Sequence, residues 1–173
     1  MDSKYFFIFM MCLSIVLFAV GGMYGYAHPF VVTKDDLDLS AGNGTSVWSV
    51  VAHNLWVGLQ MFCVGLLSLS VGGLLLIGVN GVVVGKLFHV LEQEKMLTSF
   101  ITGILPHGFI EVIGFSFFVS ASAVPLLAII SYFVTKIQRK SVKTYFYMSV
   151  ILLFLGCACI CIAGFLEVYV SFV

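Results

Sequence analysis

The residues of this chain best suited to chemistry lie in one apolar stretch, ILPHGFIEVIGF, which runs from Ile104 to Phe115. His107 and Glu111 are four residues apart, so on a helix both side chains would project from the same face. An imidazole and a carboxylate at this spacing can hydrogen-bond each other, supply two ligands to a metal ion, or carry a proton. Pro106 comes directly before the pair and, because it has no backbone N–H, predicts the start of a helix.

The composition of the chain places this motif in a membrane. Of the 173 residues, 61% are hydrophobic and 9% are charged, whereas soluble domains carry about 25% charged residues. The formal net charge is zero, which argues against a nucleic-acid partner. We therefore expect an integral membrane protein that contacts the lipid bilayer, with no nucleic-acid partner and no cofactor.

Long apolar runs predict an all-α, polytopic fold with about five transmembrane helices in a single domain, residues 1–173. The approximate spans are residues 5–26, 48–69, 72–91, 106–134 and 144–169. The first run follows Lys4 and is long enough to cross a bilayer. We therefore expect it to be a retained membrane helix rather than a secretory signal peptide.

The apolar stretch from Met96 to Thr135 is too long for one straight crossing. A helix of that length would extend about 60 Å, against a hydrocarbon core of about 30 Å. Pro106 and Pro125 are the residues that could break it. We expect a short re-entrant or interfacial helix before Pro106, over residues 96–105, and a new membrane-spanning helix that begins at Pro106.

Basic residues predict how the chain is oriented in the cell membrane. With the N-terminus in the cytoplasm, five crossings place the C-terminus outside. The basic residues that then lie on the cytoplasmic side are Lys4, Lys136, Arg139, Lys140 and Lys143. The triplet Asn43–Thr45 is an N-glycosylation sequon on the outer side, but such triplets are common by chance and carry little weight.

A few further polar residues lie within the predicted spans. His53 and Asn54 open the second span, Asn80 lies in the third and Glu167 lies near the end of the last. An amide at mid-span must find a hydrogen-bond partner, so we expect Asn80 to join two helices. The glycines around it would allow the close backbone approach this requires, and they are Gly72, Gly73, Gly78, Gly81 and Gly85.

Four roles remain open for His107 and Glu111, one of which is the binding of a partner that the sequence does not identify. Glu111 could cap the N–H groups at the start of a helix and hydrogen-bond His107, which would brace a broken helix. A metal site would need a third ligand, for which His53 or Glu167 would have to come near. A path for a proton or an ion would use the same two side chains.

Four short motifs give the chain a resemblance to a known family. HNLWVGLQMFCVGLLSL, GVNGVVVGKL, LPHGFIEV and AGFLEVYVSFV follow one another from about residue 47 to the C-terminus. In these motifs the chain resembles the stage II sporulation protein M family, polytopic membrane proteins of bacteria and archaea. The resemblance implies about five crossings, and it marks as family positions Asn54, Asn80, Gly81, His107, Gly108, Glu111 and Glu167.

The name-giving member of that family looks to be a scaffold, so the resemblance implies a non-enzymatic membrane scaffold or complex subunit. Its partners would be other membrane proteins or further copies of the chain. The first alternative is a transport component for a proton, an ion or a lipid-like substrate, with Glu111, His107 and Asn80 along the path. The second alternative is a metal-dependent intramembrane enzyme with His107 and Glu111 as ligands. We expect no catalytic residue.

Overall fold

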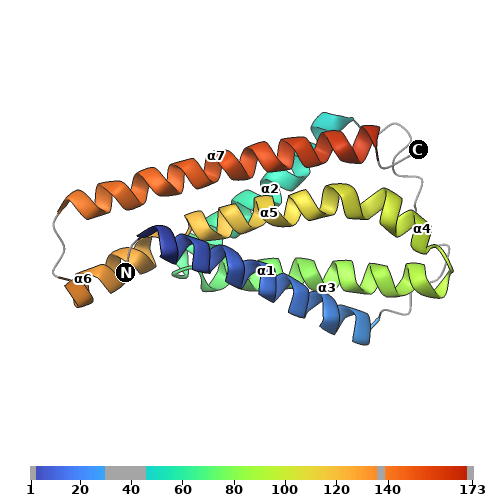
Figure 1. The fold of residues 1–173 in the computed structure, drawn as a ribbon, viewed down its shortest axis with the longest axis horizontal. Coiled ribbons are helices and arrows are strands. Elements are labelled where there is room, and N and C mark those ends of the chain that lie inside the picture. The colour runs from blue at the N-terminus through green and yellow to red at the C-terminus, as the bar shows by residue number, and fades with distance from the viewer. Residues whose placement is uncertain (1–2, 30–45, 136–138, 171–173) are drawn as a thin grey trace.

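The computed structural model describes residues 3–29, 46–135 and 139–170, where all the regular structure is helical. Figure 1 shows long helices that run back and forth between the two ends of an elongated bundle. Within the described residues, five helices are long and apolar enough to cross a membrane: Lys4–Ala27, Val47–Leu67, Val71–Gln93, Leu97–Ala121 and Val142–Tyr169. The prediction of an all-α protein with five membrane helices is therefore confirmed.

The elements follow one another in a simple order. The first three crossings are α1 (Ser3–Ala27), α2 (Val47–Leu67) and α3 (Val71–Gln93). The fourth crossing combines α4 (Leu97–Ser99), a π-helical segment (Phe100–Ile104) and α5 (Leu105–Ala121). The short α6 (Val124–Thr135) then leads to α7 (Arg139–Tyr169), which makes the last crossing.

The fourth crossing begins earlier than predicted. The chain is helical from Leu97 through the π-helical segment into α5, in place of the expected separate interfacial helix before Pro106. Pro106 does lie in the first turn of α5, directly after a π-type turn in which the Leu105 N–H donates to the Phe100 carbonyl. The wider turn accommodates the proline ring and its missing N–H without ending the helix. α5 itself begins at Leu105, one residue before the predicted start at Pro106, but the helical path extends back to Leu97.

The break in the long apolar stretch lies near Pro125 instead. α5 ends at Ala121 and α6 begins at Val124, so the crossing stops well before the predicted end at residue 134. The carbonyl groups left at the end of a helix need partners. One partner comes from α7, where the buried Ser149 hydroxyl donates to the Ala121 carbonyl at 2.8 Å.

The short helix α6 packs at the end of the bundle where α1 begins. Its Leu127 is buried in an apolar cluster with Phe6 and Phe7 of α1 and Tyr145 of α7. This cluster holds α6 against the membrane helices after the chain has left the fourth crossing. The predicted sequon at Asn43 and the basic residue Lys136 lie outside the described residues.

α1 and α3 pack backbone to backbone. A Cβ atom at Gly81 would overlap the Phe18 carbonyl oxygen, and one at Gly85 would overlap that of Gly22. Only glycine permits such an approach, which is how membrane helices commonly associate. The close packing also places Asn80, the neighbour of Gly81, beside a pocket that α1 helps to line.

Candidate functional site

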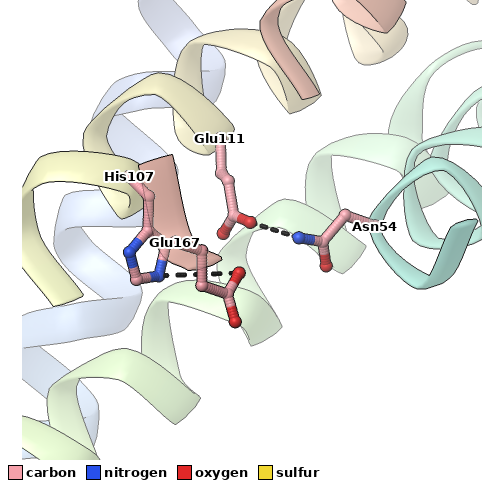
Figure 2. Close-up of polar contacts among 4 residues, drawn as sticks. All are labelled: Asn54, His107, Glu111 and Glu167. Carbon is pink, nitrogen blue, oxygen red and sulfur yellow. Dashed lines mark hydrogen bonds and ion pairs between the residues drawn. The ribbon is translucent and has the colours of Figure 1, made fainter. Parts of the chain in front are cut away.

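Four polar side chains from three membrane helices meet in one half of the bundle (Figure 2). We call them the acid–histidine cluster: Asn54 of α2, His107 and Glu111 of α5, and Glu167 of α7. All four were singled out from the sequence. The antiparallel arrangement brings them together, because α2 and the fourth crossing begin at the end of the bundle where α7 finishes.

The first link in the cluster joins α2 to α5. The Asn54 side-chain amide donates a hydrogen bond to Oε1 of Glu111, and the pair is partly buried. Hydrogen bonds between membrane helices contribute about 0.6 kcal/mol on average and up to about 1.7 kcal/mol. The Glu111 carboxylate therefore has a partner on a neighbouring helix.

The second link joins α5 to α7. His107 Nε2 lies 3.9 Å from Oε2 of Glu167, which is an ion-pair distance and too long for a hydrogen bond. The His107 ring also hydrogen-bonds the backbone of Gly103, one turn earlier in its own helix. Glu167 in addition interacts electrostatically with His53 of α2. His107 is therefore held between its own helix and α7.

Two pockets lie on either side of this cluster. The lateral pocket, of about 270 Å³, lies among α1, α3 and the fourth crossing, and its polar lining residues are Asn80, His107 and Glu111. The end pocket, of about 230 Å³, is lined by Ser49, Val50, His53, Asn54 and Glu167. Glu111 borders the first pocket and Asn54 the second, so the hydrogen bond between them lies between the two pockets.

The far side of the cluster is closed by the apolar core of the bundle. Phe115 follows Glu111 by one helical turn, and Ile160 precedes Glu167 by about two. Both are buried, 6% and 0% exposed, together with their packing partners Met61, Ile77, Phe118 and Val119. The pockets therefore reach the cluster from the half of the bundle where α7 ends, and the core seals the other half.

The remaining family positions lie outside the cluster. Asn80 donates to the Leu76 carbonyl of its own helix at 3.2 Å, so the prediction that it joins two helices is wrong. It borders the lateral pocket instead, as does Gly108. Gly81 serves the contact between α1 and α3 described above.

The acid–histidine cluster does not have the ligand arrangement of a metal site. Over residues 3–29, 46–135 and 139–170, no three His, Cys, Asp or Glu side chains are grouped closely enough to hold a metal ion. Glu167 does come near His107, but Glu111 turns toward α2, so the three side chains do not converge on one point.

Sequence reasoning missed the apolar wall of the lateral pocket. Ile15, Phe18 and Ala19 of α1 line it, and so do Phe100 and Val84. The spacing of the three α1 residues places them on one helical face, but nothing in an apolar membrane helix distinguishes a face that lines a pocket from one that meets lipid. Only the packing of α1 against α3 reveals it.

Comparison with known proteins agrees with the motifs. The family model described as Stage II sporulation protein M matches residues 5–172, which is nearly the whole chain and includes all four members of the acid–histidine cluster. No curated protein and no solved structure matches the chain significantly. With five apolar helices and this match, the chain belongs to the Stage II sporulation protein M family of membrane proteins.

Proposed function

We propose that this protein is a non-enzymatic subunit of a membrane complex that works by binding, with the acid–histidine cluster as its ligand site. The observation that carries the proposal is convergence, since four polar side chains from three spans meet between two pockets. An ionisable group at the centre of a membrane helix costs about 2.5–3.5 kcal/mol on insertion scales. Gathering three of them at one place is typical of a functional site.

The composition of the cluster supports binding over bracing alone. One hydrogen bond, from Asn54 to Glu111, suffices to tie α2 to α5. Glu167 adds a second carboxylate that interacts electrostatically with Glu111, and two like charges at close range oppose folding. Proteins usually keep such destabilising arrangements where function requires them.

The outer surface of the bundle supports the role of a complex subunit. Trp56, Phe109 and Phe154 are 60%, 67% and 76% exposed in the isolated chain. In a bilayer these large side chains face either lipid or another membrane helix. A scaffold would use such faces to hold other membrane proteins or further copies of this chain.

A transport component is the second candidate, favoured by the position of the cluster between two pockets. A proton, an ion or the polar group of a lipid-like substrate that entered the end pocket would meet His53 and Glu167 first. It would then reach the Asn54–Glu111 hydrogen bond before the lateral pocket. Passage to the other end would require the apolar core to open.

We further propose that the end pocket faces the outside of the cell. Lys4 and Lys143 lie near the ends of α1 and α7 that are remote from this pocket. Basic residues favour the cytoplasmic side of a membrane protein. This places the N-terminus in the cytoplasm, the C-terminus outside and the cluster in the outer half of the bilayer.

Native mass spectrometry of the full chain, released from membranes in a mild detergent, tests the binding proposal. We expect the wild-type protein to carry a small-molecule adduct and Glu111→Gln to lose most of it. Glutamine keeps an acceptor for the Asn54 amide but removes the negative charge.

Glu94→Gln is the matched control, because Glu94 is exposed at the end of α3, away from both pockets. It should keep the adduct. A wild-type protein without an adduct, or equal adducts in all three proteins, would contradict the proposal.

A further inference from the structure

We infer that the lateral pocket binds a single-chain amphiphile whose head is a cation with hydrogen-bond donors, that is, a long-chain ammonium. The inference rests on the proposed function and names the class of ligand for the same site. It depends on how the pocket opens, on which polar atoms face into it, and on which charges surround it.

The lateral pocket opens toward the lipid. Three residues on its lining are well exposed in the isolated chain, with Ile15 at 42%, Leu105 at 51% and Phe109 at 67%. In a bilayer these side chains meet acyl chains, so an apolar chain can enter from the side. Drug-sized ligand sites usually measure about 300–1,000 Å³. The volume of about 270 Å³ lies just below that range, which suits a single chain.

Two hydrogen-bond acceptors remain available at the base of the pocket. The Asn80 amide donates one of its two N–H bonds to the Leu76 carbonyl, which leaves its oxygen and its second N–H for a ligand. Oε1 of Glu111 already accepts from Asn54, which leaves Oε2. A head that donates hydrogen bonds can pair with both oxygens, whereas a head that only accepts can pair, among these atoms, with the second Asn80 N–H alone.

The charges around Glu111 favour a cation. The described residues give Glu111 an uncharged amide partner, Asn54, and a second acid, Glu167. His107 is engaged with Glu167 and the Gly103 backbone. A carboxylate at membrane depth is stabilised when a positive charge pairs with it. An ammonium head in the lateral pocket would supply that charge.

Aromatic rings in the wall strengthen the preference for a cation. Phenylalanine faces attract ammonium groups through their π electrons, more strongly where water is excluded. Four such residues, from α1 and the fourth crossing, line the lateral pocket: Phe18, Phe100, Phe109 and Phe115.

The probe that tests this inference is dodecylammonium, compared with dodecanol and dodecanoate, which have the same chain. The readout is the melting temperature of the purified full chain in a neutral detergent. We expect dodecylammonium to raise the wild-type value by about 4 °C and the other two amphiphiles to have much smaller effects.

Three variants and a control locate the effect. Glu111→Gln should lose the shift because it removes the charge. Ala19→Phe should lose it by filling the pocket from α1, and Val84→Phe does the same from α3 if the first variant fails to fold. Glu94→Gln, away from the pocket, should keep it.

Equal shifts in melting temperature with all three amphiphiles would overturn the inference. A shift with dodecylammonium that persists in Glu111→Gln and in both pocket-filling variants would overturn it as well. A cluster-dependent shift produced only by dodecanoate or dodecanol also overturns the cation preference, while the binding proposal stands. The binding proposal itself fails on the adduct measurement described above.

Discussion

Replacing Gly81 with alanine is expected to lower the stability of the bundle by about 3 kcal/mol, whereas the same change at Gly78 is expected to be neutral or stabilising. The new Cβ at position 81 would overlap the Phe18 carbonyl oxygen, which belongs to backbone and can move only if α1 and α3 separate. At Gly78 the nearest atom is the Leu17 carbonyl oxygen at 3.8 Å, an ordinary contact. Alanine also favours a helix over glycine by about 1 kcal/mol.

Unfolding titrations in mixed detergent micelles measure both variants against the wild-type protein. The two glycines lie on the same helix and undergo the same change, so they control for each other. Two adjacent glycines of α1, Gly21 and Gly22, offer a second comparison. A Cβ atom at Gly21 would overlap the carbonyl oxygen of Gly78, whereas a Cβ atom at Gly22 would lie 3.6 Å from the carbonyl oxygen of Gly81. Equal effects at Gly78 and Gly81 would mean that α1 and α3 do not pack as described.

Glu111→Ala is expected to destabilise the bundle by about 2 kcal/mol, because it removes the acceptor of a partly buried hydrogen bond and leaves the Asn54 amide unsatisfied. Asn54→Ala should cost at least as much, because it leaves the partly buried Glu111 carboxylate without its hydrogen-bond donor. The loss in the free energy of unfolding of the double variant should be about 1 kcal/mol smaller than the sum of the losses in the two single variants. A double-mutant cycle, followed by the same unfolding titration, gives this coupling free energy.

Ser14→Ala provides the control for that cycle. Ser14 is buried in α1 and donates to the Met10 carbonyl of its own helix at 2.8 Å, so it has no contact with the cluster. When Ser14→Ala is combined with Glu111→Ala, the loss of stability should equal the sum of the two single losses. Additivity between Asn54 and Glu111 as well would show that their hydrogen bond contributes nothing in the folded protein.

The sequence predicted the membrane spans well because the length of an apolar run is a strong and local signal. Pro106 and Pro125 show where local signals end. Both prolines permit a break, but the chain passes Pro106 through a π-helical turn and breaks just before Pro125. The difference depends on nonlocal partners, such as the Ser149 hydroxyl that satisfies the end of α5, and no local pattern encodes them.

The sequence also identified the members of the cluster but not their pairing. Spacing favoured a hydrogen bond between His107 and Glu111, because residues four apart share a helical face. The partner of Glu111 is Asn54, 57 residues away in sequence. That choice depends on how α2 packs against α5, which the polarity of single residues does not reveal. The apolar wall of the lateral pocket escaped prediction for the same reason.

The claim that the acid–histidine cluster serves binding more than bracing is tested most directly by neutralising both of its acids. The measurement is the melting temperature of delipidated Glu111→Gln/Glu167→Gln protein relative to delipidated wild type. Glutamine keeps an acceptor for Asn54 and removes two interacting acids. The relief of their repulsion should offset the loss of the longer contacts of Glu167 with His107 and His53, so we predict an equal or higher melting temperature for the double variant. A drop of several degrees, similar to that of Glu111→Ala, would contradict the claim and show that the charges hold the bundle together.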